Sequence, residues 1–269
     1  DADTPGVPWG MPCNLGPIHA ILSWNERGVH RAERGSTGTG PPQGGPISMQ
    51  RWSPEIIRYL YTAADHSRYY QDLARQLGAF LRPEDRPYCA HVTAVDRSPA
   101  AVAALRARGE DPKLSALTGD IRELPPRQPY DAMVFCLFGG TEETLAIAAR
   151  QCGGTALVVR RDFRRHQFSS GVRMAGHTAA DMERELQRRG LTYTARRFTL
   201  EFGQPFLSLD DAQTFFRLYS RDGAVPSRQE LAQRLELSAW ADYPLYLPNP
   251  KPLCLLAIPA AQLREEMYG

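Results

Sequence analysis

The sequence contains few cysteines and histidines, and neither residue type is spaced to bind a metal. Its five cysteines are odd in number and include no CxxC pair: Cys13, Cys89, Cys136, Cys152 and Cys254. The six histidines form no cluster with the spacing of metal ligands. Scattered, unpaired thiols in a chain of 269 residues predict a reduced cytoplasmic protein without a disulfide framework or a metal.

Long apolar runs and an excess of charge are also absent. No apolar run reaches the roughly 18 residues that a membrane-spanning helix requires, and the polar, Pro- and Gly-rich start does not resemble a signal peptide. The formal net charge is only +2, so no overall field attracts nucleic acid or an acidic membrane. We therefore expect a small-molecule substrate, with neither nucleic acid nor membrane as partner, and leave a homodimer open.

The chain divides into two parts by composition. Residues 1–48 are rich in Pro and Gly, including the linker-like stretch "RGSTGTGPPQGGP" at 34–46, and only Pro17–Trp24 is apolar enough for a short regular element. Residues 49–269 show regular hydrophobic patterns. We expect an irregular segment at 1–48 followed by one α/β domain at 49–269.

Strands and helices alternate through the second part. Helices are predicted between Ser53 and Leu81, and strand–helix pairs then begin with "HVTAVD" at His91–Asp96 and "YDAMVFCLFGG" at Tyr130–Gly140. Such alternation predicts a doubly wound, mostly parallel sheet. Two long C-terminal strands, at 191–206 and 251–260, are expected to pair antiparallel and to enclose a helical lid insertion at about 209–245.

Three strand ends carry side chains suited to nucleoside binding. Ligands of such sheets lie beyond the carboxyl ends of the strands. Asp96 ends one predicted strand, where a carboxylate can accept both hydroxyls of a ribose. Asp120 and the backbone of Ile121 end the next, and Phe138–Gly140 end the third, where small residues allow close approach. Taken singly, Asp96 also suits a helix cap and Asp120 a turn.

The order of these motifs resembles that of the class I S-adenosylmethionine-dependent methyltransferases. The resemblance lies in "VTAVDRSPAAVAALRARG", "LTGDIRELP", "YDAMVFCLFGG" and "GGTALVVRRDF", and extends over roughly Ser53–Pro259. It implies a seven-stranded Rossmann-like sheet with an antiparallel last strand and S-adenosylmethionine as cofactor. It also implies that Asp96 binds the ribose and that Asp120 and Ile121 bind the adenine; we add Arg97, Phe138 and Tyr70 as expected cofactor contacts.

One motif of that family is missing. A strand ending in an acid and followed by alternating glycines should stand directly before "PYCAHVTAVD". Three explanations are open: a segment is missing from the sequence between about Arg86 and Pro87; the chain is a degenerate member that no longer binds cofactor; or the strand comes from elsewhere, with Ala32–Gly40 as the candidate. The first is favoured because the other motifs are intact.

The substrate side is less defined. Candidate substrate contacts are Arg160, Arg161, Tyr69 and Tyr219, and the candidate catalytic residues are His166, Tyr69 and Tyr219. The favoured function is methyl transfer to a small molecule. The alternatives are a non-catalytic binding or scaffold protein with this fold and an NAD(P)-dependent Rossmann oxidoreductase, for which Asp96 would also suit the ribose.

Overall fold

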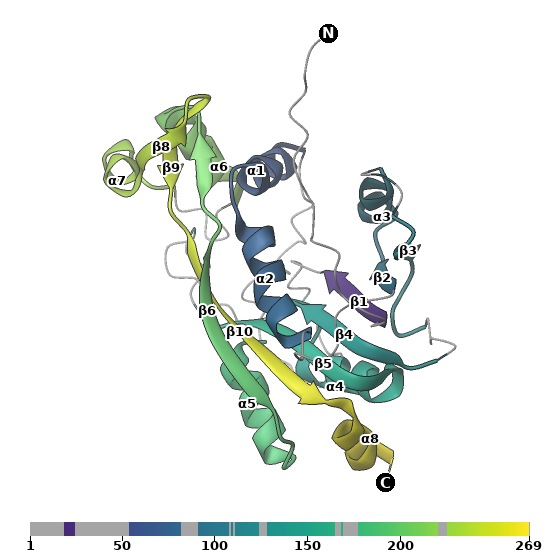
Figure 1. Cartoon of the computed structure of the whole chain (residues 1–269). Coiled ribbons are helices and arrows are strands. Elements are labelled where there is room, and N and C mark those ends of the chain that lie inside the picture. The colour runs from purple at the N-terminus through teal and green to yellow at the C-terminus, as the bar shows by residue number, and fades with distance from the viewer. Residues whose placement is uncertain are drawn as a thin grey trace, which may run out of the picture.

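The computed structural model is built around a seven-stranded sheet in the order β3-β2-β1-β4-β5-β10-β6 (Figure 1). It describes residues 19–24, 54–81, 91–107, 109, 111–123, 128–164, 168, 177–219 and 225–268. The strands are β1 (His19–Trp24), β2 (His91–Asp96), β3 (Leu114–Thr118), β4 (Tyr130–Cys136), β5 (Cys152–Arg161), β6 (Thr194–Glu201) and β10 (Pro250–Pro259). The first five are mutually parallel, and β10 runs antiparallel to both β5 and β6. The α/β class is confirmed, and the last strand is antiparallel as expected.

Helices cover both faces of this sheet. They are α1 (Pro54–Asp65), α2 (Tyr69–Leu81), α3 (Pro99–Arg106), α4 (Thr141–Gln151), α5 (Ala179–Arg188) and α8 (Ala260–Tyr268). Alternate residues of β4 and β5 point to opposite faces, as the period of two in a strand requires. Phe135 and Val158 pack with α4, α5 and α8, whereas Val134 and Leu157 pack with α2.

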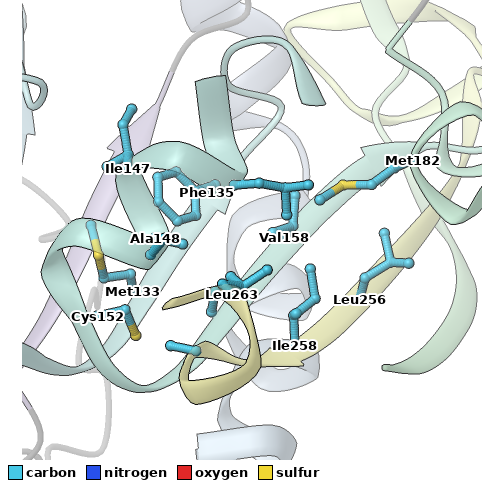
Figure 2. Packing of buried hydrophobic residues seen from close by; sticks show 14 of the residues in the cluster. Met133, Phe135, Ile147, Ala148, Cys152, Val158, Met182, Leu256, Ile258 and Leu263 are labelled. Carbon is cyan, nitrogen blue, oxygen red and sulfur yellow. The ribbon is translucent and has the colours of Figure 1, made fainter. Parts of the chain in front are cut away.

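The first of these two cores is the larger one. Figure 2 shows Phe135, Val158 and Ile258 packed beside Ala148 of α4 and Leu263 of α8. All five side chains are fully buried. Burial on both faces explains why β4 and β5 are nearly continuous apolar runs.

The central strand comes from the N-terminal segment. β1 pairs in parallel with β2, in the register His19 with His91, and with β4, in the register Ala20 with Ala132. The favoured explanation, a segment missing between Arg86 and Pro87, is therefore not needed to complete the sheet, because residues 19–24 fill the central position; the strand comes from elsewhere in the chain, as the third explanation had it, but from a different segment. The strand lies before the proposed candidate at 32–40, which is outside the described residues, as are Arg86 and Pro87.

A second, three-stranded sheet lies within the predicted lid. The strands β7 (Gln204–Phe206), β9 (Tyr243–Leu247) and β8 (Glu236–Trp240) pair antiparallel in that order, beside the helices α6 (Leu209–Tyr219) and α7 (Arg228–Arg234). The prediction of a purely helical insertion is therefore incomplete. Proline and aromatic residues in "DYPLYL" obscured the pattern of β9, whose partner strand lies immediately before it.

Helix α1 belongs to this lid by its packing. Tyr59 of α1 lies in a small core with Phe206, Phe215 and Leu247, and its ring contacts Phe215 edge to face at 5.2 Å. The hydroxyl of Tyr59 also donates to the Asp211 carboxylate at 2.5 Å. Figure 1 shows this lid on the side toward which β1 and β4 point, so it stands over the carboxyl edge of the large sheet.

The chain passes from sheet to lid through a hydrogen-bonded joint. Tyr246 donates its hydroxyl to Glu201 at 2.8 Å and accepts the Gly203 N–H at 3.1 Å. Asn249 donates its backbone N–H to the same Glu201 at 2.7 Å. The predicted single strand at 191–206 is thus split into β6 and β7 at this joint.

Candidate functional site

The candidate site is the edge where the parallel strands end. Because β1, β2, β3 and β4 run in one direction, their carboxyl ends meet at the same side of the sheet. Asp96 at the end of β2 pairs in register with Thr118 at the end of β3. The Gly119 N–H donates to the Asp96 carbonyl at 3.0 Å, so the turn carrying Asp120 begins beside Asp96.

The carboxylate of Asp96 is oriented by the turn that follows it. Its Oδ1 accepts the Ser98 N–H at 2.7 Å, and Ser98 in turn caps α3 by accepting the Ala101 N–H at 3.3 Å. The cap of α3 is therefore Ser98 and not Asp96, as had been considered; the side chain of Asp96 forms a turn directly before the cap, which fixes the carboxylate at the edge of the sheet.

Asp120 is held by an arginine that the sequence did not single out. Its Oδ1 accepts the backbone N–H of Arg122 at 3.0 Å and the Arg122 Nε–H at 2.9 Å, and its Oδ2 also pairs with Arg122. The guanidinium of Arg97 lies 3.9 Å away. Hydrogen bonding from Arg122 lowers the pKa of Asp120 to about 2. The carboxylate is therefore ionised and already engaged, so Arg122 must share it with any ligand.

Two side chains at the end of α4 hold the turn that follows Asp120. The buried Gln151 donates its side-chain amide to the Ile121 carbonyl at 2.6 Å, and Arg150 donates to the Arg122 carbonyl at 2.6 Å. The side chain of Ile121 is itself part of the core. The Ile121 carbonyl accepts a hydrogen bond from Gln151. The backbone N–H is therefore the group of Ile121 that could make the expected contact with adenine.

The loop between β4 and α4 is the third part of the edge. Leu137 and Gly139 have positive φ angles of 51° and 57°. Arg160, at the end of β5, is only 1% exposed and donates to the carbonyls of Phe138, Gly139 and Gly140. The loop is therefore tightly bent and held from inside the protein.

An ion pair connects the turn to this loop. Arg122 lies 3.6 Å from Glu143 in the first turn of α4, and Glu143 accepts the Gly140 N–H at 3.4 Å. Asp96, Asp120 and Phe138–Gly140 are thus adjacent through a continuous set of contacts. The structure brings together five of the predicted cofactor residues: Asp96, Arg97, Asp120, Ile121 and Phe138.

The remaining candidates lie elsewhere. Tyr69 is 1% exposed and packs with Tyr70 against Phe202, between α2 and the sheet. Tyr219 stacks on Phe215 at 5.1 Å in the core of the lid. Tyr69 and Tyr219 therefore belong to different cores, and both are engaged in packing.

The structure separates the two arginines proposed as substrate contacts from each other in role. The buried position of Arg160 indicates that it positions the β4–α4 loop, rather than contacting a substrate as expected. Arg161 is half-buried, and its backbone forms a bridge to Thr178. His166 lies outside the described residues.

Sequence reasoning missed four residues that position the edge: Arg122, Glu143, Thr144 and Gln151. Glu143 could have been found, since "GGTEET" has an acid at the third helical position, where its side chain can accept the N–H of the N-cap residue. Thr144 and Gln151 reach their partners only through the packing of α4 against the sheet, whereas Arg122 contacts Asp120 two residues away in the same turn. Among the described residues, no cluster of His, Cys, Asp and Glu is arranged to hold a metal, and no helix has the length and apolarity to cross a bilayer.

No protein-family model matches the sequence, and neither does any curated protein. The chain is similar to solved structures at low identity. A functionally unknown protein from Deinococcus radiodurans is 15% identical, with 63% of this chain and 69% of that chain covered and a TM-score of 0.38. A candidate methyltransferase from Bacillus halodurans is 12% identical, with 64% and 84% covered and the same TM-score of 0.38.

A third solved structure is the magnesium protoporphyrin IX methyltransferase of Synechocystis with bound SAH. It is 14% identical, with 63% of this chain and 64% of that chain covered and a TM-score of 0.34. At these identities and TM-scores the matches carry no argument about this chain. The sheet itself can be compared with the expectation: a parallel sheet closed by an antiparallel strand, β10, between β5 and β6 is the sheet that the sequence resemblance implies.

Proposed function

We propose that the chain binds S-adenosylmethionine at the edge formed by Asp96, Asp120 and Phe138–Gly140 and transfers its methyl group to a small molecule. The observation that carries this proposal is the placement of two carboxylates at the ends of neighbouring parallel strands, directly beside a glycine loop at the end of a third. This is the arrangement that the sequence resemblance implies for the ribose and adenine of that cofactor.

The residues present fit the nucleoside half of the cofactor. Asp96 is oriented toward the edge by Ser98, and a carboxylate there suits paired ribose hydroxyls. Gly139 leaves no room for a side chain, because it has a positive φ angle of 57° and a Cβ at this position would lie 2.9 Å from Glu143 Oε2. The segment after β1, where a glycine loop for the methionine half would stand, lies outside the described residues.

The chemistry expected of the chain is mostly positioning. When bound, S-adenosylmethionine supplies the methyl group, whose bond to sulfur breaks as its bond to the acceptor forms. Orienting two reactants in a closed site can account for a large part of such a rate enhancement. The lid built from α1, α6, α7 and the small sheet lies on the side of the large sheet toward which β1 and β4 point (Figure 1), and we propose that it excludes water from a small acceptor.

Ligand binding tests the proposal directly. Calorimetry should show binding of S-adenosylmethionine and S-adenosylhomocysteine to the wild-type chain, and Asp96→Ala should weaken it about tenfold or more, since a charged hydrogen bond contributes about 1.5–3 kcal/mol. Asp242→Ala serves as the matched control, because this exposed acid lies between β8 and β9.

Other outcomes favour the two alternatives. Calorimetric binding of NADH or NADPH, without binding of S-adenosylmethionine or S-adenosylhomocysteine, would identify a dinucleotide oxidoreductase instead. Folded protein that binds none of the four would favour a non-catalytic binding or scaffold protein.

A further inference from the structure

Arg160 is a buried cation whose hydrogen-bond partners among the described residues include no carboxylate. It is the largest fully buried side chain among the described residues, and a buried charge must be compensated. Its guanidinium donates to the Gly139 carbonyl at 2.9 Å, the Gly140 carbonyl at 3.3 Å and the Thr144 hydroxyl at 2.9 Å, and also to the Phe138 carbonyl. Four oxygens of one short segment therefore take the place of an acid.

The segment that receives these hydrogen bonds is held in an unusual conformation. Leu137 has a φ of 51°, and a left-handed conformation costs a residue with a Cβ about 1–2 kcal/mol. Such a conformation persists only where surrounding contacts fix it. The Leu137 N–H donates to the Val159 carbonyl at 3.1 Å, so residues 159 and 160 of β5 hold both ends of the bend.

The direction of these carbonyls determines where the loop's N–H groups point. In a planar trans peptide the C=O and N–H point in opposite directions. Because the Phe138 and Gly139 carbonyls face Arg160 inside the protein, the N–H groups of Gly139 and Gly140 face away from it. Glu143 accepts the Gly140 N–H, whereas the Gly139 N–H has no hydrogen-bond acceptor among the residues that the structure describes.

We infer that Arg160 is a positioning residue that presents the Gly139 N–H as a hydrogen-bond donor to the cofactor at the carboxyl edge. The inference rests on the proposed function for the identity of the ligand, but the loop geometry is independent of it. The planar guanidinium group with its several N–H donors is needed here, because one side chain must donate to three successive carbonyls. Lysine retains the charge but lacks this planar group.

Arg160→Lys tests the inference, with Arg264→Lys as the matched control. Arg264 donates to the Cys152 carbonyl at the opposite end of the same strand, so its substitution also removes an arginine–carbonyl contact from β5. We expect Arg160→Lys to weaken S-adenosylhomocysteine binding at least tenfold in calorimetry and to speed amide hydrogen exchange at 137–141. Arg264→Lys should change neither, even where both variants lower the unfolding temperature. Thr144→Val, which removes one of the four acceptors, should give a smaller change in the same direction if Arg160→Lys does not fold.

Three outcomes of these measurements would contradict three different claims. Unchanged exchange at 137–141 in folded Arg160→Lys would overturn the positioning role. Faster exchange with unchanged S-adenosylhomocysteine affinity would overturn the role of the Gly139 N–H as a ligand donor. A wild-type chain that binds no S-adenosylhomocysteine would instead refute the proposed function, and the exchange measurement would still decide whether Arg160 holds the loop.

Discussion

At the scale of the residue, Asp120 links the stability of the fold to its candidate site. Its carboxylate is held by the backbone and side chain of Arg122 and has a pKa of about 2, below the ordinary value of about 3.9. A carboxyl whose pKa is lower in the folded state contributes stability above its unfolded pKa and loses it as pH falls through the folded pKa. The relevant window is therefore pH 4 to pH 2.

Asp120→Asn should lower the free energy of unfolding by about 1–2 kcal/mol at pH 7. The difference from the wild type should shrink as pH falls from about 4 to 2, because the wild-type carboxyl is then neutralised. Urea unfolding at a series of pH values measures this. A difference that stays constant with pH would show that Asp120 acts through neutral hydrogen bonds and not through its charge.

At the scale of the element, the joint between the large sheet and the lid depends on one glycine. A Cβ on Gly203 would lie 2.3 Å from the Tyr246 hydroxyl oxygen and 2.5 Å from the Leu247 carbonyl oxygen. The latter is a backbone atom in β9, which also pairs with β7. The strands of the lid and the strands of the sheet therefore meet here without room for any side chain.

Gly203→Ala should destabilise the protein by about 2 kcal/mol or more, because the added methyl group forces the joint apart. Gly78→Ala is the control: no atom lies within 4 Å of its added Cβ, and it lies inside α2, so it should stabilise by about 0.5–1 kcal/mol. Thermal unfolding should show a lower unfolding temperature for Gly203→Ala and a higher one for Gly78→Ala. Equal effects of the two substitutions would contradict the packing described at the joint.

At the scale of the whole molecule, the central position of the sheet is filled by residues from near the start of the sequence. β1 pairs on both sides, with β2 and with β4. A sheet without this strand would leave two rows of backbone donors and acceptors unpaired. The whole parallel half of the fold therefore depends on six residues, 19–24.

Ile21→Pro should lower the free energy of unfolding by about 2–3 kcal/mol, because proline removes an N–H from a strand that is paired on both sides. Ile21→Val, which keeps a β-branched residue, is the matched control. Chemical denaturation provides the comparison. A proline variant as stable as the wild type would show that residues 19–24 do not form the central strand. A segment missing beside Arg86 would then be the best explanation, and the intact mass of the protein should exceed 30.0 kDa.

The sequence alone was sufficient for the features that depend on local pattern. The alternation of strands and helices and the positions of Asp96, Asp120 and Phe138 at strand ends follow from periodicity and turn chemistry, which are local, whereas the antiparallel last strand was implied by the family resemblance. Sequence order along a parallel sheet also places those ends at one edge. It offered Pro17–Trp24 as a possible short element but did not place it at the centre of the sheet, because a single strand of six residues within a Pro- and Gly-rich segment carries too little pattern to identify its partners.

The tertiary structure decided which groups hold the site. Arg160 contacts a loop about 20 residues earlier, and Gln151 contacts Ile121 at a separation of 30 residues. Neither pairing has a sequence signal, since both follow from how α4 and β5 pack together. Burial likewise determines that Arg160 positions a loop and that Tyr69 packs in a core, because the surroundings of a polar side chain, and not its type, fix whether it can meet a ligand.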